Sequence, residues 1–278
     1  MIWQTTRFDI DLARPRVMGI VNVTPDSFSD GGRLGDTAIA HCERLLADGA
    51  ELLDIGGEST RPGATAVDAQ TERDRVLPVL RAALKLGVPV SLDTSSPTLM
   101  REALGLGTDI INDVRALRRP GALAELAAHP RAGVCLMHMK GEPDTMAGEV
   151  GYGDVVAEVR QFLAQRVAEL RAAGVAAERI VVDPGIGFAK GAEHNLQLLA
   201  RQAELLDIGR PLLVGWSRKG TLGRITGRPV GDRLAASLAA ALLAVQRGAA
   251  IVRVHDVRAT VDAIRVWQAT GSGRIEQA

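Results

Sequence analysis

The stretch IVRVHDV, residues 251–257, has the pattern of a strand buried inside a domain, yet it carries charged side chains. Residues 251–254 are β-branched and apolar except for Arg253, and β-branched side chains favour strands. Arg253 and His255 are two positions apart, so they share one face of such a strand. Burying a charge is costly unless a partner neutralises it. The stretch therefore predicts a strand whose Arg253 and His255 face an anion.

Seven similar runs precede this one and alternate with helical patterns. The eight runs are RVMGIVNV from Arg16, ELLDIGG from Glu51, VPVSLDT from Val88, TDIINDV from Thr108, AGVCLMHM from Ala132, RIVVDPG from Arg179, PLLVGWS from Pro211 and AIVRVHDV from Ala250. Apolar residues recur at helical spacing between them, for example in residues 38–50, 155–174 and 233–249. This alternation predicts parallel pairing, and eight units in about 250 residues fit a (β/α)8 TIM barrel. An open, doubly wound sheet is the alternative, although no GxGxxG motif follows the first strand.

Composition and length indicate one soluble domain. No linker, low-complexity segment or charge block divides the chain, so we expect a single domain over residues 1–278, with its core from about 15 to 270. Lysine plus arginine total 33, as do aspartate plus glutamate, so no overall field favours nucleic acid or a membrane as partner. The longest apolar run, residues 235–245, is too short to span a bilayer, and no signal peptide is evident. Two cysteines argue against a disulfide framework. We expect a cytoplasmic protein.

Polar residues follow the apolar part of each predicted strand. They are Asn22, Asp54, Asp93, Asn112, His138, Asp183, Ser217 with Lys219, and Arg253 with His255. A lone Asp or Asn after a strand can instead form a turn or a helix cap. For Asp93 this is less favoured, because Ser96 and Pro97 already supply a helix start. Because active sites of such barrels lie at the carboxyl ends of the strands, the whole set predicts a site there.

The loops after the first two predicted strands are unusually long. They are NVTPDSFSDGGRLGD, residues 22–36, and GGESTRPGATAVDAQT, residues 56–71. Most strand–helix connections have about 2–6 residues, and longer loops commonly serve as lids or binding loops. Phe28 lies in the first loop and Phe188 follows the sixth strand, although the chain has only four phenylalanines. These two rings suggest a flat organic substrate, unless each packs beneath its own loop.

Taken in order, these motifs resemble the dihydropteroate synthase family along nearly the whole chain. The motifs are MGIVNVTPDSFSDGG, DIGGESTRPGA, SLDTS, INDV, MHMKGEPDTM, DPGIGFAK with HN beyond it, GWSRKG and RVHDV. The resemblance implies the TIM barrel, a homodimer, Mg²⁺ as cofactor and a transferase of folate biosynthesis. Its reaction condenses 6-hydroxymethyl-7,8-dihydropterin diphosphate with 4-aminobenzoate to give 7,8-dihydropteroate and diphosphate.

The resemblance also implies which residues meet each part of the substrates. The implied diphosphate ligands are Asn22, Arg61, Arg253 and His255, with Asn22 also on the metal. This agrees with general chemistry, because the last two βα loops of such barrels often bind phosphate and a guanidinium can donate two hydrogen bonds to it. The implied pterin ligands are Asp93, Asn112, Asp183 and Lys219. The implied aminobenzoate ligands are Phe28, Thr60, Pro62, Phe188, Ser217 and Lys219.

The implied catalytic residues are Asp93, Arg61, Lys219, Arg253 and His255. We expect diphosphate to leave the pterin methylene carbon with help from Mg²⁺, and Asp93 to stabilise the resulting cation. For several of these residues a structural role is the alternative. Asp93 and Asp183 could pair with basic side chains, and His255 could be a core histidine bonded to backbone.

Two other functions remain open from the sequence. A folate:corrinoid methyltransferase-type domain has a similar pterin-binding barrel, but it has no use for a diphosphate cluster such as RVHD. A non-catalytic paralogue that only binds pterin is the other, although every residue assigned above is present.

Overall fold

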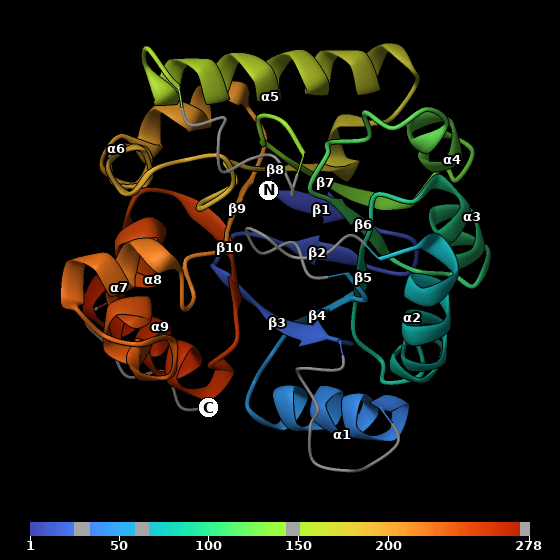
Figure 1. Cartoon of the computed structure of the whole chain (residues 1–278), viewed down its shortest axis with the longest axis horizontal. Helices are drawn as coiled ribbons and strands as arrows, with labels where there is room; N and C mark the ends of the chain where they lie inside the picture. Colours follow the sequence, from blue (N-terminus) through green and yellow to red (C-terminus); the bar gives the residue numbers. More distant parts are fainter. Residues whose placement is uncertain (25–33, 59–66, 143–150, 273–278) are drawn as a thin grey trace.

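The computed structural model describes residues 1–24, 34–58, 67–142 and 151–272. Within these residues, eight parallel strands close into a barrel in the order β10–β3–β4–β5–β6–β7–β8–β9 (Figure 1). The strands are β3 (Arg16–Asn22), β4 (Leu52–Gly56), β5 (Val90–Asp93), β6 (Ile110–Asp113), β7 (Gly133–Met137), β8 (Ile180–Asp183), β9 (Leu212–Val214) and β10 (Ala249–Val254). Seven lie within the predicted runs, and β10 begins one residue before its run, so the predicted (β/α)8 barrel is confirmed.

Helices surround the barrel and connect its strands. They are α1 (Leu34–Ala47), α2 (Ala69–Ala83), α3 (Pro97–Gly105), α4 (Ala122–Ala127), α5 (Val155–Ala172), α6 (Ala192–Ala200), α7 (Gly220–Thr226), α8 (Leu234–Gln246) and α9 (Val257–Ser272). Short 3₁₀ turns are η3 (Ala177–Arg179), η4 (Gln202–Ile208) and η5 (Val230–Asp232). The expected start of α3 is confirmed, since Ser96 Oγ accepts a hydrogen bond from Leu99 N. None of the helices in the described part of the chain has the length and apolar character needed to cross a bilayer.

The alternation of side chains along each strand separates core from site. Leu52, Ile110, Val181 and Ile251 belong to one buried apolar cluster. Two residues further along the same four strands come Asp54, Asn112, Asp183 and Arg253. Because residues two apart in a strand share a face, the barrel interior is apolar where its strands begin and polar where they end. The polar end is therefore built by strand register rather than by loop conformation.

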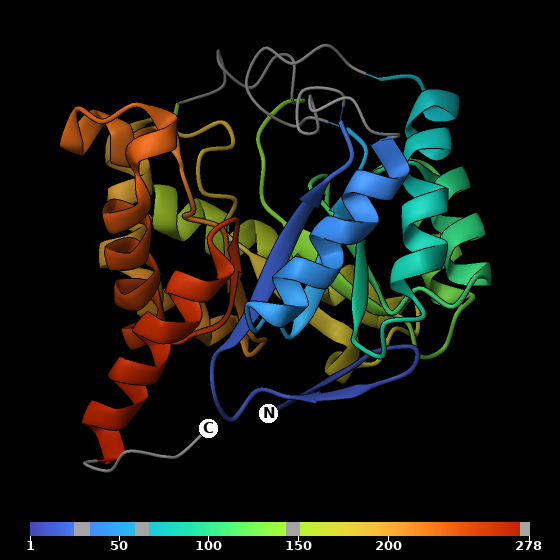
Figure 2. The same cartoon turned by 90° about the horizontal axis from the view of Figure 1, so that it is seen from below.

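A short antiparallel hairpin, which the sequence did not lead us to expect, closes the other end. It consists of β1 (Ile2–Gln4) and β2 (Asp9–Asp11), and Figure 2 shows it across the end where the barrel strands begin. Trp3 is fully buried in the interior cluster, and its Nε1 donates to the carbonyl of Arg179 over 2.9 Å. The hairpin thus seals the apolar end with an aromatic plug whose polar atom is satisfied.

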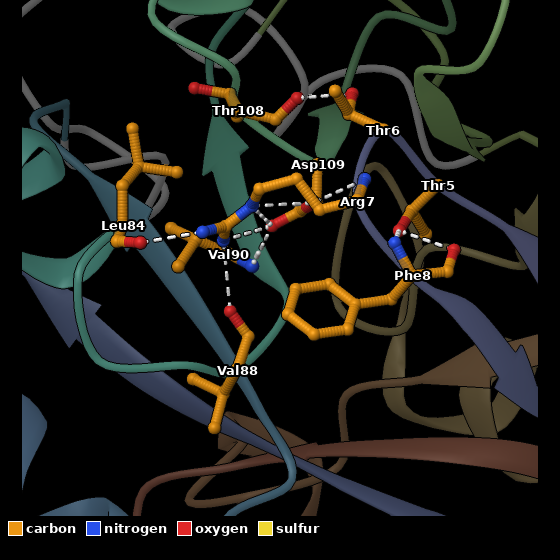
Figure 3. Close-up of polar contacts among 9 residues, drawn as sticks. All are labelled: Thr5, Thr6, Arg7, Phe8, Leu84, Val88, Val90, Thr108 and Asp109. Carbon is orange, nitrogen blue, oxygen red and sulfur yellow. Dashed lines mark hydrogen bonds and ion pairs between the residues drawn. The ribbon is translucent and has the colours of Figure 1, made fainter.

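Arg7, in the hairpin turn, ties this plug to the barrel (Figure 3). Its Nε and Nη2 both donate to the carboxylate of Asp109, which is fully buried just before β6. Two further guanidinium bonds reach the carbonyl oxygens of Leu84 and Val88. Asp109 Oδ2 also accepts from Val90 N, so one carboxylate joins the hairpin to β5.

We expect Asp109→Asn to lower the free energy of unfolding by about 2 kcal/mol, because it weakens charge-assisted hydrogen bonds at a buried acceptor. Denaturant unfolding measures this change. Asp9→Asn is the matched control, since Asp9 pairs with Arg131 at the surface and its side chain is 58% exposed. That substitution should cost less than about 1 kcal/mol. Equal effects of the two variants would contradict the anchoring role of Asp109.

Candidate active site

The base of the candidate site is a network centred on Arg253. Its Nε donates to Asp54 Oδ2 over 2.6 Å, and its Nη2 donates to Asp93 Oδ2 over 3.0 Å. Asn112 Nδ2 donates to the same Asp54 oxygen at 3.1 Å. The Asp54 side chain is fully buried, whereas that of Arg253 is 21% exposed. The sequence predicted that Arg253 faces an anion, and in the structure its guanidinium pairs with two carboxylates of the chain itself.

Asp93 has an unusual protonation equilibrium. Burial raises its pKa to about 8, and the nearby Asp54 carboxylate acts in the same direction. The Arg253 guanidinium opposes this rise without cancelling it. A cation placed beside Asp93 would act in the same direction as Arg253 and lower the pKa of Asp93, because an opposite charge favours the ionised form. Asp93 would stabilise that cation to the same extent, so its position suits a ligand that becomes positively charged.

The end of β8 contributes Asp183, and the loop after it contributes Phe188. Asp183 is buried, its Oδ1 accepts from Gly185 N over 2.7 Å, and burial raises its pKa. The positive charges of Lys219 and Arg253 act on the same carboxyl in the opposite direction. Lys219 Nζ lies 4.4 Å from the centroid of the Phe188 ring, within the range of a cation–π contact. Charges from β10 and from the segment after β9 therefore act on Asp183 at the end of β8.

Ser217 and His255 form a second pair beside this cluster. Ser217 Oγ lies 3.0 Å from His255 Nδ1 and accepts from the His255 backbone N–H over 3.2 Å. Burial, and the neighbouring charges of Arg218 and Arg253, lower the pKa of His255 to about 3. The imidazole is therefore neutral at physiological pH. The direction of the bond between Ser217 Oγ and Nδ1 depends on the imidazole tautomer. In the tautomer in which the serine donates to Nδ1, the imidazole proton lies on Nε2.

The structure places most of the predicted site residues at one end of the barrel. Asp93, Asn112, Asp183 and Arg253 lie on the inner face of their strands, and Asn22 is the last residue of β3, which pairs with β10. The pairing of Asp93 with Arg253 matches the structural alternative for Asp93, yet both partners belong to the predicted site. The remaining predictions, Phe28, Thr60, Arg61 and Pro62, lie outside the described residues.

Sequence reasoning gave no role to several residues that structure the site. Asp54 was recognised at the end of its strand, but its bond to Arg253 joins residues 199 positions apart. Lys190 and His138 are both buried, and their side chains contact each other at 2.9 Å. His138, like Asp54, was recognised at the end of its strand, but its contact with Lys190 was not. Lys190 gave no local signal, because lysines in glycine-rich loops are usually exposed.

Comparison with known proteins identifies the family. A model of the pterin-binding enzymes matches residues 18–255. Dihydropteroate synthase of Neisseria meningitidis serogroup B is 52% identical over 278 residues, covering 97% of this chain and 98% of the relative. The chain belongs to the dihydropteroate synthase family. The predicted family and the enzymatic activity, that of a transferase in folate biosynthesis, are thereby confirmed.

Solved dihydropteroate synthases share the fold closely. The enzyme of Xanthomonas albilineans with 4-aminobenzoic acid superimposes with a TM-score of 0.90 at 51% identity, covering 95% of this chain and 96% of that one. A structure from the same organism in complex with 7,8-dihydropteroate has a TM-score of 0.90 at 47% identity, covering 98% and 99%. These relatives bind a substrate and the product of the reaction that the motifs predict.

Proposed function

We propose that this chain condenses 6-hydroxymethyl-7,8-dihydropterin diphosphate with 4-aminobenzoate and releases 7,8-dihydropteroate and diphosphate. The observation that carries the proposal is the convergence of Asp93, Asp183 and Arg253 at the polar end of the barrel. Relatives of about 50% identity bind 4-aminobenzoic acid and 7,8-dihydropteroate. Two acidic groups suit a ring that carries N–H donors and becomes cationic, and the guanidinium suits its leaving group.

In this proposal the pterin ring lies against Asp183, Asn112, Asp93 and Lys219. The ring presents an amino group and a ring N–H on one edge, and the Asp183 carboxylate is the acceptor that matches this pair. Buried donor–acceptor matches discriminate strongly, because a wrong ring leaves polar groups unpaired. The Lys219 ammonium reaches the carbonyl side of the ring. Its contact with Phe188 supports a neighbouring aminobenzoate pocket, to which Phe28, Thr60 and Pro62 would contribute.

Arg253 and His255, with Asn22 and Arg61, are the proposed ligands of the diphosphate. The neutral His255 can donate from Nε2 to a phosphate oxygen, since Ser217 occupies its Nδ1. The Arg253 guanidinium binds Asp54 and Asp93 through Nε and Nη2, which leaves Nη1 outside both ion pairs. A phosphate oxygen at Nη1 would then share the guanidinium with the carboxylates.

Ser217 is a case in which the contacts support a role other than the one implied by resemblance. We expect Ser217→Ala to raise the KM for the pterin diphosphate about fivefold, because losing one hydrogen bond of about 1 kcal/mol frees the His255 ring. The KM for aminobenzoate should stay within twofold. Steady-state kinetics with each substrate varied in turn measures both values. The opposite pattern would return Ser217 to the aminobenzoate pocket.

The proposed reaction is a substitution at the pterin methylene carbon. The carbon–oxygen bond to diphosphate breaks while Arg253 and His255 offset the charge that develops on the leaving group. The dihydropterin ring spreads the positive charge left behind, and the Asp93 carboxylate stabilises it. The aniline nitrogen of aminobenzoate then forms the new carbon–nitrogen bond and gives its proton to solvent. An aniline is neutral near pH 7, so positioning replaces a strong general base.

Magnesium fits the residues of the site only together with the diphosphate. No group of three or more His, Cys, Asp or Glu side chains arranged to hold a metal occurs in the described part of the chain. Mg²⁺ commonly takes phosphate oxygens and water with one or two protein ligands, and the amide oxygen of Asn22 could supply one. When bound, the ion would offset charge on the diphosphate. Calorimetric titration of Mg²⁺ with and without diphosphate tests this, and equal binding in both would contradict it.

Incubating the purified chain with both substrates and Mg²⁺ tests the function directly. We expect 7,8-dihydropteroate and an equal amount of diphosphate, detected by chromatography and a phosphate-release assay. Binding of the pterin without product would favour the non-catalytic paralogue. Methyl transfer from a methylated folate to a corrinoid protein, without condensation, would favour the methyltransferase-type domain.

We also propose that the chain acts as a homodimer in the cytoplasm. Apolar side chains are exposed on and beside α7 and α8, namely Ile225, Val230, Leu234 and Leu243. An exposed apolar patch commonly marks a protein interface. Both cysteines, Cys42 and Cys135, are buried thiols, as suits a reducing compartment. Sedimentation equilibrium is expected to give twice the chain mass, and Leu243→Glu should shift this toward the monomer.

A further inference from the structure

The segment from Asp183 to Lys190 carries two residues of the proposed site on an irregular backbone. Its φ angles are positive at Gly185, Gly187 and Ala189. A Cβ on Gly185 would lie 2.0 Å from the carbonyl oxygen of His138, so the loop touches the end of β7 closely. Loops without regular backbone pairing need side chains or close packing to fix them. The question is which groups hold Asp183 and Phe188 in place.

Lys190 holds the loop from one side. Its Nζ contacts His138 Nδ1 at 2.9 Å and the carbonyl oxygens of Gly185 and Phe188 at 3.0 Å each. The carbonyl oxygen of His138 is a fourth acceptor, at 3.2 Å. A single ammonium group therefore joins the end of β7 to two points of the loop. Because these acceptors are one ring nitrogen and three carbonyl oxygens rather than a carboxylate, the group acts as a hub and not as half of an ion pair.

Lys190 is unusually buried for a lysine. The residue is only 7% exposed. Burial lowers its pKa to about 7, Asp183 raises it, and Lys219 and Lys140 lower it. Burial also lowers the pKa of His138 to about 2, so its ring is neutral and Nδ1 can accept. Burying a lysine in this way is costly, which favours a role beyond general stability.

Asn195 of α6 holds the loop from the other side. Its Oδ1 accepts from Gly187 N over 2.8 Å, and its Nδ2 donates to Thr221 Oγ1 over 3.0 Å. The same amide donates to the carbonyl oxygens of Lys190 and Gly191. Thr221 lies in α7, two residues after Lys219. Asn195 thus joins the loop that carries Phe188 to the helix that follows Lys219.

We propose that Lys190 and Asn195 are positioning residues that fix the 183–190 loop, so that Asp183 meets the pterin and Phe188 meets the aminobenzoate. The proposal rests on the function proposed above for what the loop contacts. In this proposal both residues act through the loop and not by contact with substrate. Lys190 sets the loop relative to β7, and Asn195 sets Phe188 relative to Lys219, which forms the facing wall of the aminobenzoate pocket.

The first test is Lys190→Met, which keeps an unbranched chain and removes the ammonium. We expect the KM for each substrate to rise about tenfold, while kcat at saturation falls less than threefold, because bound substrates can reorder the loop. Lys140→Met is the matched control. Lys140 follows β7, two residues after His138, but its ammonium binds Gly151 O and Glu158 rather than the 183–190 loop. Its KM values should stay within twofold of those of the unmodified chain.

A second variant and an activity-independent measurement cover the case in which Lys190→Met folds poorly. Asn195→Ala should raise the KM for aminobenzoate more than that for the pterin, because it separates Phe188 from Lys219. Hydrogen exchange followed by mass spectrometry should show faster exchange in residues 183–190 of either variant, with the barrel strands unchanged. A folded variant with both KM values and the loop exchange within twofold of normal would overturn the proposal. Inactivity of the unmodified chain would instead reject the proposed function, and loop exchange would still decide the roles of Lys190 and Asn195.

Discussion

Replacing Arg253 with alanine should reduce kcat/KM for the pterin diphosphate roughly 100- to 1,000-fold, the loss seen when one preorganised electrostatic donor is removed from other enzymes. The side chain is placed between the diphosphate that it is proposed to bind and the carboxylates of Asp54 and Asp93. Its removal withdraws positive charge from the leaving group. It also leaves two acidic groups facing each other in the substrate-free site.

The second effect predicts how the stability of the Arg253→Ala variant depends on pH. The pKa of Asp93 is raised to about 8 in the folded chain, against about 3.9 when unfolded, so this group's contribution to stability falls as pH rises between the two values. Arg253 lowers the pKa of Asp93, so its loss moves the folded value higher still. The decline then continues above pH 8, where that of the unmodified chain has levelled off.

Thermal unfolding at pH 7 and pH 9, together with steady-state kinetics, measures both effects. The difference in stability between the variant and the unmodified chain should widen at pH 9. Arg14→Ala is the control, because Arg14 forms an ion pair with Glu51 at the opposite end of the barrel and its side chain is 52% exposed. Near-normal turnover by folded Arg253→Ala would count decisively against the diphosphate site.

Asp183→Asn should weaken binding of the pterin about 100-fold, equivalent to about 2.8 kcal/mol. Asp183 Oδ1 accepts from Gly185 N, so an asparagine would keep its oxygen there and turn its NH₂ group toward the ligand. That group would face the N–H donors of the pterin edge and leave them unpaired in a buried site. In the variant, the pterin N–H groups would therefore face a hydrogen-bond donor in place of the carboxylate acceptor.

Isothermal titration calorimetry with a pterin ligand measures the change. Burial raises the pKa of Asp183, so the affinity of the unmodified chain should rise with pH until the carboxyl group is ionised, and the variant should lose this dependence. Asp113→Asn is the matched control. Asp113 is also a buried carboxyl at the end of a strand, but it accepts from Ser95 Oγ and the backbone N–H groups of Arg115 and Leu117. Its pterin affinity should change less than threefold.

The barrel could be predicted from sequence because its signals are local. Each strand is a short apolar run, and each polar residue after it follows from the two-residue period. The position of Arg253 and Asp183 at one end therefore required no knowledge of tertiary structure. The N-terminal hairpin was missed because its strands have three residues each, too few for a period to emerge. The main sequence signal of the hairpin was the large apolar side chain of Trp3, which the structure shows to be buried.

The partners of the site residues could not be predicted in the same way. The bond between Arg253 and Asp54 depends on how β10 and β4 are staggered on either side of β3, and a local pattern carries no information on stagger. Ser217 illustrates the same limit. Its place after β9 was evident, but its contact with His255 depends on two loops meeting. Lys190 was hidden for a further reason, because burial of its ammonium depends on carbonyl groups from distant backbone.

The pairing of Arg253 with Asp54 and Asp93 has a consequence for ligand selection. The pocket carries its own counter-ions, so inorganic phosphate or sulfate must compete with them and should bind feebly. The pterin diphosphate brings N–H donors to the acidic groups and an anion to the guanidinium in one step, so both sides of the ion pair gain a new partner. We expect selectivity to arise from this exchange, with each fragment alone recognised far less well than the intact molecule.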